Sequence, residues 1–314
     1  MKAYKGFDEN LKCRGFQYEI GKEYEEATAS ICNKGFHACE YPLDCFSYYE
    51  PAKSRFCEVD IADNGERRTD TKVCGTKIKI GAEIGIPGLV KATIEYVTER
   101  AKPSNRHHTT GSRSANSATG DWSANSATGY GSANSATGYG SANSATGYGS
   151  ANSATGYGSA NSATGSRSAN SATGDWSANS ATGDWSANSA TGSRSANSAT
   201  GDWSANSATG YGSANSATGS RSANSATGYG SANVSTGTEC ANNGEGERNV
   251  SVGWGKDNKC KGSVGSFLVL SEWGDWDGNK YPFIGTTMVE VDGETIKADT
   301  YYSLVNGKVV ECDA

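Results

Sequence analysis

The sequence predicts a mainly β protein, in which a β-solenoid lies between an N-terminal α+β domain and a C-terminal β-meander cap. From Ser114 to about Gly237, a nine-residue word (Ser-Ala-Asn-Ser-Ala-Thr-Gly plus two variable residues) starts fourteen times, and thirteen words keep all seven constant residues. A short fixed period is typical of stacked coils. The word has no large apolar residue at helical spacing, and its glycine would cost about 1 kcal/mol inside a helix. Strands and turns are therefore expected.

Small polar residues with glycine are also typical of disordered, low-complexity chains, and slippage of repeated DNA would give the same regularity. A stack accounts better for the strict period, because coils ~4.8 Å apart bring identical residues into contact. We expect Ala, Ser and Thr methyl groups to fill the interior. Asn side chains are expected to form hydrogen-bonded ladders.

Two words are expected to form one coil, because nine residues are too few to close a loop around even a small core. Eighteen residues would give a flattened coil with one short strand and one turn on each side. Fourteen words then make seven coils, a rod of about 34 Å. Calcium-binding nonapeptide arrays share the period, but the constant word lacks their aspartate ligands. We therefore expect no metal and no cofactor.

The two variable residues of each word come from three pairs: Ser-Arg, Asp-Trp and Tyr-Gly. Their place beside a glycine predicts turns whose side chains point outward. With eighteen residues per coil, every second pair stacks, so the pairs form columns on two opposite edges. The first edge would carry Tyr130, Tyr148, Arg167, Trp185, Trp203 and Arg221, and the second edge Tyr139, Tyr157, Trp176 and Arg194.

These ten side chains are the candidate binding residues. Arg beside Trp permits cation–π contacts of ~0.5–1 kcal/mol, so one interpretation is that the columns only cover and stabilise the turns. Another is a recognition edge for a protein or a small aromatic, nucleotide-like ligand, because Trp, Tyr and Arg are enriched at binding hot spots. A third interpretation is that the solenoid binds ice or another repetitive surface through a flat face. On that face, Thr119, Thr137 and Thr155 would form a regular column.

The formal net charge of −6 is unevenly distributed. Residues 1–111 hold 17 basic and 17 acidic side chains, residues 112–231 hold 4 of each, and residues 232–314 hold 7 basic and 13 acidic ones. A neutral array lacks the basic stripe that binds a nucleic-acid backbone, and it also lacks the dense acidic charge of a DNA mimic. We therefore expect no binding to a nucleic-acid backbone.

Residues 1–102 are expected to form a small α+β domain, followed at 103–113 by a linker that leads into the first coil. Alternating residues predict strands, and apolar positions at helical spacing predict helices, the longer of which buries Val90, Ile94 and Val97. The expected strands are Lys2–Phe7, Arg14–Ile20, Arg55–Ile61 and Thr76–Ile80, and the expected helices are Leu43–Tyr49 and Pro87–Ala101.

Residues 238–314 are expected to contain degenerate coils and a cap that hides the last open strand edge. Phe267–Leu270 is apolar enough for a buried strand. Asp-Gly and Asn-Gly dipeptides are strong hairpin signals. They occur at 292–293 and 306–307, so Val289–Ile296 and Tyr301–Val310 are predicted hairpins.

The first residues of the chain and its cysteines indicate the cellular compartment. The first residues are charged rather than an apolar leader, and no apolar run reaches membrane-spanning length. Nine cysteines, an odd number, indicate reduced thiols. A cytoplasmic protein without a membrane segment is expected. Cys32, His37, Cys39 and Cys45 are close enough to suggest zinc, but they lack a Cys-x-x-Cys pair, and buried thiols are the expected alternative.

Three motifs mark the N-terminal domain: Tyr4-Lys5-Gly6-Phe7, Cys13-Arg14-Gly15-Phe16-Gln17-Tyr18-Glu19 and Gly35-Phe36-His37-Ala38-Cys39-Glu40. They resemble an uncharacterised domain family of phage, prophage and related bacterial proteins. In that family the domain often precedes Ala-, Gly- and Thr-rich tandem repeats and a tail like Val291-Asp292-Gly293-Glu294-Thr295. The resemblance implies a phage or mobile-element context in a bacterial host cell, and no known activity.

The order of an aromatic-basic-glycine strand, a glycine-aromatic turn, a short helix and a further strand is also similar to the ADP-ribosyltransferase fold. This similarity implies a transferase-like N-terminal domain. The sequence departs from the family at Lys5, where many members have Arg or His, and no catalytic glutamate can be assigned. No phosphate-binding loop, His-Glu-x-x-His motif or Gly-x-Ser-x-Gly elbow occurs in the chain.

The sequence thus predicts a non-enzymatic binding or scaffolding protein of phage type, with no catalytic residues and no cofactor. An ice- or repetitive-surface-binding solenoid and an ADP-ribosyltransferase-like enzyme are the alternatives. The sequence leaves the partner's identity, the oligomeric state and the handedness of the coil open.

Overall fold

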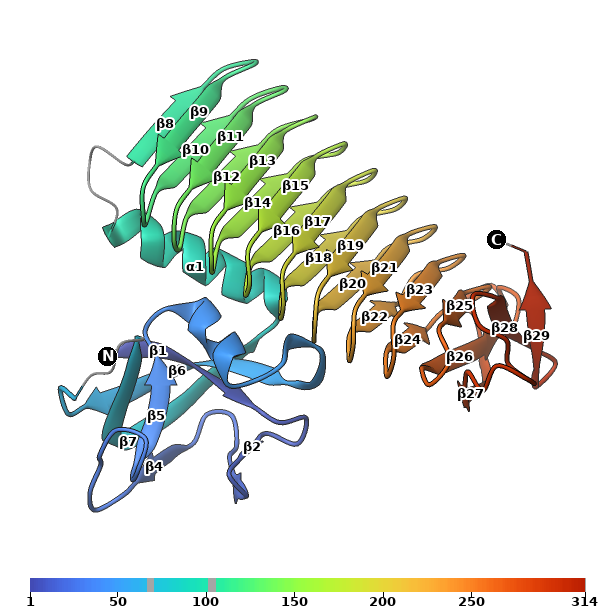
Figure 1. Cartoon of the computed structure of the whole chain (residues 1–314), viewed down its shortest axis with the longest axis horizontal. Helices are drawn as coiled ribbons and strands as arrows, with labels where there is room; N and C mark the ends of the chain where they lie inside the picture. The colour runs from blue at the N-terminus through green and yellow to red at the C-terminus, as the bar shows by residue number, and fades with distance from the viewer. Residues whose placement is uncertain (67–70, 101–105, 314) are drawn as a thin grey trace.

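A β-solenoid dominates the fold, as the repeat predicts (Figure 1). The computed structural model describes residues 1–66, 71–100 and 106–313. Short strands wind into two parallel sheets, which we name the covered sheet and the open sheet. The covered sheet contains β8 (Arg106–Thr110), β10 (Ala124–Thr128), β12 (Ala142–Thr146), β14 (Ala160–Thr164), β16 (Ala178–Thr182), β18 (Ala196–Thr200), β20 (Ala214–Thr218), β22 (Ala232–Ser235), β24 (Val250–Gly253) and β26 (Phe267–Trp273). The open sheet contains β9 (Ala115–Thr119), β11 (Ala133–Thr137), β13 (Ala151–Thr155), β15 (Ala169–Thr173), β17 (Ala187–Thr191), β19 (Ala205–Thr209), β21 (Ala223–Thr227), β23 (Ala241–Glu245) and β25 (Lys259–Gly262).

The coil length of two words is confirmed by the pairing of the strands. In the covered sheet Ala142 pairs with Ala160, and in the open sheet Ala151 pairs with Ala169, so each strand pairs with the strand eighteen residues further on. Parallel pairing also continues beyond the repeats. At one end β8 lies in the segment expected to be a linker, and at the other β23 to β26 lie beyond residue 237.

The alternation within each strand decides what fills the solenoid. In the strand sequence Ala-Asn-Ser-Ala-Thr, the Asn and the second Ala point inward, as Asn161 and Ala163 do at 0% and 1% exposure. The first Ala, the Ser and the Thr share the outer face, because strand side chains alternate with period two. The expectation that Thr methyl groups fill the interior is therefore wrong. From Ser123 to Ser231, the serine before each strand is buried instead, as at Ser159.

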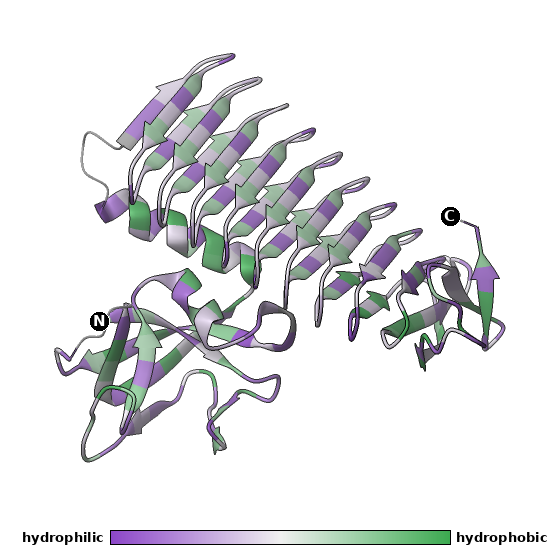
Figure 2. Cartoon of the chain, in the orientation of Figure 1, coloured by the Kyte–Doolittle hydropathy of each residue, from purple (hydrophilic) through white to green (hydrophobic). Residues whose placement is uncertain are grey.

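The Asn ladders are present in both sheets. The amide Nδ2 of Asn161 donates to Oδ1 of Asn179 at 3.0 Å, one coil further on, and to the carbonyl of Ser171 on the opposite sheet at 2.6 Å. Hydrogen bonds that run along and across the rod replace much of an ordinary apolar core. Figure 2 shows the resulting alternation as stripes of high and low hydropathy along the stack.

The N-terminal domain is a five-stranded sheet with the order β4-β7-β5-β1-β6. Its elements are β1 (Lys2–Phe7), β4 (Glu23–Glu25), β5 (Phe36–Cys39), β6 (Arg55–Asp63) and β7 (Lys72–Ile84), with a small hairpin of β2 (Lys12–Cys13) and β3 (Phe16–Gln17) and two 3-10 helices, η1 (Pro42–Ser47) and η2 (Pro51–Lys53). The strands expected at 2–7, 55–61 and 76–80 are present. The strand expected at 14–20 shortens to β3, because Arg14 and Gly15 adopt positive φ and turn the chain.

Helix α1 (Ile86–Arg100) connects the domain to the array and lies along the covered sheet (Figure 1). Its buried face includes Leu89, Val90 and Val97, which join one apolar cluster with the outward alanines of the covered sheet. These alanines, at Ala124, Ala142, Ala160, Ala178 and Ala196, are 0–4% exposed. The expected helix at 87–101 is therefore present within one residue at each end, and it buries one face of the rod.

The C-terminal cap extends each sheet separately. Strand β27 (Phe283–Glu290) pairs antiparallel with β26 of the covered sheet, while the hairpin of β28 (Tyr301–Val305) and β29 (Lys308–Cys312) continues the open sheet. The Asn306-Gly307 turn is present, but the hairpin predicted at 289–296 is wrong. There the Asp292 carboxylate accepts the backbone N–H groups of Glu294 and Ile296, which closes a local turn instead.

Within the described residues, no helix combines the length and apolarity needed to cross a membrane.

Candidate functional site

The first edge of the solenoid is formed by the turns that follow the covered strands. In its Asp-Trp and Ser-Arg pairs the second residue has positive φ, 62° at Trp185 and 59° at Trp203, whereas glycine takes this position in the Tyr-Gly pairs. A side chain in this left-handed region costs about 1–2 kcal/mol. Hydrogen bonds between successive turns offset the cost: Asp184 Oδ1 accepts the N–H of Asp202 at 3.0 Å, and the N–H of Trp185 donates to the Asp202 carbonyl at 2.9 Å.

The candidate residues on the first edge form one continuous column, as their spacing predicts. Tyr130 stacks on Tyr148 with centroids 5.5 Å apart, and Trp185 stacks on Trp203 at 5.1 Å with an interplanar angle of 2°. Guanidinium groups cover the exposed ring faces. Arg167 lies 5.4 Å from the ring centroid of Tyr148, and Arg221 lies 5.0 Å from that of Trp203. Cations and aromatic pairs therefore alternate along this edge.

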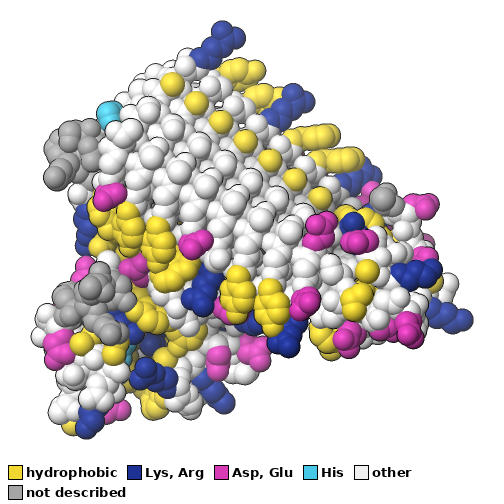
Figure 3. All heavy atoms as spheres, viewed as in Figure 1, with side chains coloured by type: hydrophobic (Ala, Val, Ile, Leu, Met, Phe, Trp, Pro, Cys, Tyr) yellow, Lys and Arg dark blue, Asp and Glu magenta, His cyan; other side chains and the backbone are white. Residues whose placement is uncertain are grey.

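This edge faces solvent along its length. The residue exposure is 57% at Tyr130, 56% at Trp185 and 45% at Trp203. Figure 3 shows its aromatic and basic side chains projecting from the upper right edge of the rod. At the C-terminal end, Arg221 forms an ion pair with Glu239, with Nε and Oε2 2.6 Å apart.

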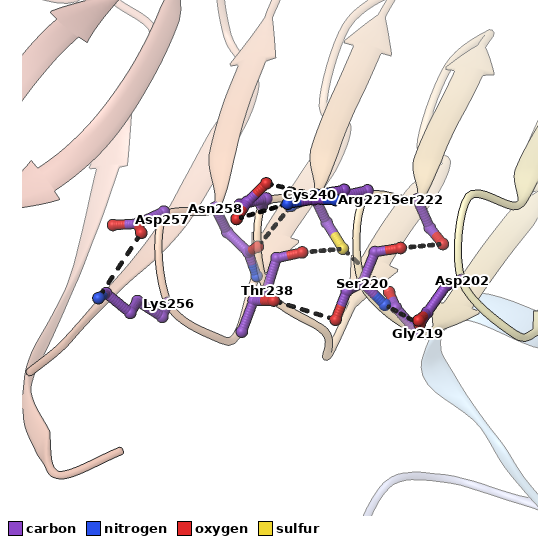
Figure 4. Close-up of polar contacts among 11 residues, drawn as sticks. Asp202, Gly219, Ser220, Arg221, Ser222, Thr238, Cys240, Lys256, Asp257 and Asn258 are labelled. Atoms are coloured by element: carbon purple, nitrogen blue, oxygen red, sulfur yellow. Dashed lines mark hydrogen bonds and ion pairs between the residues drawn. The ribbon is translucent and has the colours of Figure 1, made fainter. Parts of the chain in front are cut away.

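The degenerate coils keep the same edge geometry with other residues (Figure 4). Ser220 donates its backbone N–H to Asp202 Oδ1 at 2.7 Å, and Thr238 Oγ1 donates to Ser220 Oγ at 3.0 Å. Directly after the turn, the backbone N–H of Cys240 donates to Asn258 Oδ1 at 2.7 Å. The column of turns therefore continues without a break into the cap.

The second edge lies against the N-terminal domain. Tyr41 is fully buried there, packs 5.2 Å from the ring of Trp122, and donates its hydroxyl to the carbonyl of Gly158. Arg194 donates from Nη1 to the carbonyl of Ser47 at 3.1 Å. The four candidates expected on this edge are all half-buried, at Tyr139, Tyr157, Trp176 and Arg194. Trp176 and Arg194 help to hold the two parts of the chain together, and the four residues are less accessible to a partner than those of the first edge.

The tyrosines of this interface are kept protonated. Burial raises the pKa of Tyr41 well above its ordinary value, and burial also raises the pKa of Tyr157. Beyond the interface the second edge is solvent-exposed again, where Tyr211 stacks on Tyr229 at 5.7 Å. This pair was not among the candidates, although its Tyr-Gly words are the same as those at the other positions.

From β9 to β21 the open sheet presents a flat face without charged side chains. Its outward Ala, Ser and Thr side chains form columns, and Thr119, Thr137 and Thr155 are exposed as predicted. A shallow groove of about 1120 Å³ follows the face from Ala115 to Ala241. The corresponding alanines of the covered sheet lie under α1, so only one of the two faces is open.

A pocket of about 480 Å³ lies in the N-terminal domain, and residues of all three N-terminal motifs line it, although no site was predicted there. Lys5 Nζ donates to the carbonyl of His37 at 2.9 Å and to Cys13 Sγ at 3.6 Å, and the Tyr49 hydroxyl donates to the same sulfur at 2.9 Å. Gly6 makes room for the tyrosine, because a Cβ there would lie 2.4 Å from Tyr49 Cδ2.

His37 shapes one wall of this pocket. Its Nε2 accepts the backbone N–H of Cys32 at 2.8 Å, and burial lowers the pKa of His37. The imidazole is therefore neutral and holds the turn before β5. All nine cysteines are free thiols, and the described residues contain no group of three His, Cys, Asp or Glu side chains that could hold a metal ion.

Residues 1–92 match a domain of unknown function, DUF7666. The match fits the resemblance of the N-terminal motifs to an uncharacterised family. No curated protein and no solved structure matches the chain.

Proposed function

We propose that the protein is a non-enzymatic binding or scaffolding protein whose first edge engages a partner protein. The observation that carries the proposal is that part of the second edge is buried in an interface. There, the same kinds of side chain form an interface with the N-terminal domain, through Trp122, Trp176 and Arg194. The first edge presents an equivalent surface that nothing in the described chain covers.

The stacking favours a protein over a small flat ligand. Trp185 and Trp203 cover each other's faces, and Arg221 covers the outer face of Trp203. A nucleotide-like ring would have to separate these contacts to lie on either face of Trp203. The free ring edges instead suit edge-to-face contacts with aromatic side chains, which contribute about 0.5–1.5 kcal/mol each beyond their buried area.

The test is partner capture with a double variant. Trp185 and Trp203 would both be changed to Asn, which tolerates positive φ. Immobilised wild-type chain and variant would be exposed to lysate of the native host, and captured proteins compared by mass spectrometry. The matched control changes Tyr211 and Tyr229, the exposed stack on the second edge, to Ser. We expect the control to retain a partner that the Trp variant loses. A partner captured equally by the Trp variant would contradict the proposal.

The open sheet supports a second candidate, the binding of ice or another repetitive surface. Its exposed threonine column repeats at the strand spacing, and the strands from β9 to β21 carry no charged side chain. Thermal hysteresis at micromolar protein would test this candidate. A Thr155→Lys variant should abolish the effect by breaking the flat column, and absence of hysteresis in the wild-type chain would remove the candidate.

The N-terminal motifs support a phage or mobile-element origin and a place in the bacterial cytoplasm. The similarity to ADP-ribosyltransferases supports one further alternative, an enzyme in the N-terminal domain. Turnover of NAD by the full chain would establish that alternative, and its absence would favour the binding role.

A further inference from the structure

The N-terminal pocket contains a buried cation that has no counter-ion among the described residues. Lys5 is 6% exposed, and its ammonium contacts the His37 carbonyl, the Cys13 sulfur and the ring faces of Phe7 and Tyr18, at 5.4 and 5.7 Å from the ring centroids. No carboxylate of the described residues forms an ion pair with it. A buried charge without an opposite charge is costly, so an anion in this pocket would be strongly stabilised.

The geometry of the ammonium leaves it able to hold a ligand. An ammonium has three N–H donors, and two of them have acceptors, at His37 and Cys13. Of these, the thiol sulfur is a weak acceptor. At least one donor is therefore free for an oxygen atom inside the pocket.

The remaining charges of the pocket also favour an anion. Arg14, at the turn between β2 and β3, and Lys72, on β7, line it, whereas Glu26 is its one acidic residue among those described. His37 is neutral because burial lowers its pKa. Basic residues thus outnumber acidic ones in the described lining of the pocket, which favours anions there.

The other walls are aromatic. Phe16, Phe36, Tyr18 and Tyr48 line the pocket, and Phe16 is 48% exposed. A volume of about 480 Å³ lies in the range of small-molecule sites, which combine apolar walls with a few polar groups. We propose that this pocket binds a small molecule in which an oxyanion is joined to an aromatic ring, with the oxyanion beside Lys5 and the ring between the aromatic walls.

The first experiment separates the two parts of the ligand and the two kinds of oxyanion. Titration calorimetry with the full chain would use phenyl phosphate and benzoate as probes, phenol as the ring alone, and inorganic phosphate and acetate as the anions alone. We expect one of the two aromatic anions to bind at least tenfold more tightly than phenol and than its own anion. Equal binding of phenol, or no binding of either aromatic anion at millimolar concentration, would overturn the proposal.

The second experiment uses variants. Lys5→Met keeps the length and apolar stem of the side chain and removes its charge, and Lys77→Met, on β7 outside the pocket, is the matched control. We expect Lys5→Met to weaken the binding of the better probe at least tenfold and the control to leave it unchanged. If Lys5→Met does not fold, Arg14→Asn serves in its place, because Asn tolerates positive φ. We expect Arg14→Asn also to weaken the binding of the better probe. Unchanged affinity in the folded variants would overturn the proposal.

A chemical readout locates the bound probe. Cys13 lines the pocket and is partly exposed, and Cys312, in the cap, is also partly exposed. The probe should slow the alkylation of Cys13 by iodoacetamide and leave that of Cys312 unchanged. Binding without protection of Cys13 would place the ligand elsewhere and contradict the assignment to this pocket.

Discussion

The side-chain amide of Asn143 donates a 3.0 Å hydrogen bond to the side-chain carbonyl of Asn161, its equivalent one coil further along the covered sheet. The same amide donates to the carbonyl of Ser153 on the open sheet at 2.7 Å. Each asparagine therefore connects its coil to the next and one sheet to the other. This double connection lets a rod with an interior of Asn, Ala and Ser remain stable without large apolar side chains.

Replacing an asparagine in the middle of the ladder should be strongly destabilising. Asn161→Ala removes the donors to Ser171 and Asn179 and leaves buried polar groups without partners. We expect a loss of about 2–4 kcal/mol in the free energy of unfolding, measured by urea denaturation. Thr164→Ala, on the exposed face of the same strand, should change it by less than about 0.5 kcal/mol. Similar effects of the two changes would show that the ladder contributes little.

Replacement of two glycines in one turn by alanine should reduce the stability of the protein to very different extents. At Gly147 a Cβ would lie 2.3 Å from the Gly129 carbonyl oxygen of the neighbouring coil, and φ is +138°. At Gly149, where φ is +70°, a Cβ would meet no atom within 4 Å. We expect Gly149→Ala to cost about 1–2 kcal/mol and Gly147→Ala to cost more or to prevent folding. Thermal unfolding of both variants tests this order, and a reversed order would contradict it.

The docking of the N-terminal domain should depend on the hydroxyl of Tyr41. Tyr41→Phe keeps the packing against Trp122 and leaves the buried carbonyl of Gly158 without its donor. A loss of about 1–3 kcal/mol is expected, together with faster proteolysis between the domain and the array. Tyr148→Phe, on the solvent-exposed first edge, is the control. If both variants behave like the wild-type chain, the hydroxyl does not stabilise the interface.

The stability of the N-terminal domain should decrease as the pH decreases, because of His37. Burial lowers the folded pKa of His37 below its ordinary value of about 6.5, and the positive charges of Lys72, Lys5 and Arg14 act in the same direction. The unfolded chain therefore binds a proton more readily, so stability that is present above pH 6.5 is lost as the pH falls through the folded pKa. Urea midpoints between pH 7.5 and 5 would show the decrease, and His37→Asn should reduce it.

Much of the array follows from its sequence because the same word repeats. The word length, the period of eighteen and the turn positions were enough to place Trp185 above Trp203. Thr164 was misplaced because a small β-branched residue fits either side of a strand, and only the position of the inward Asn161 decides which.

The intramolecular interface and the pocket were beyond sequence reasoning for another reason. Trp176 and Trp185 stand in identical Asp-Trp words, and only the docking of the N-terminal domain on the second edge decides which one is covered. The pocket depends on Lys5 of β1, Cys13 of β2 and Tyr49, which follows η1, and these residues share no motif. In both cases contacts between elements, and not local spacing, determine the environment of the side chain.

The pairing of strands eighteen residues apart also restricts how the repeat can change length through recombination. Loss or gain of two words from the middle of the array shortens or lengthens the rod by one coil and keeps every later pair on its own edge. Loss of one word would exchange the edges and the sheets for all coils that follow. Because β27 extends one sheet and β28 the other, the cap would then meet the wrong strands. Viable descendants of this sequence should therefore differ by even numbers of words.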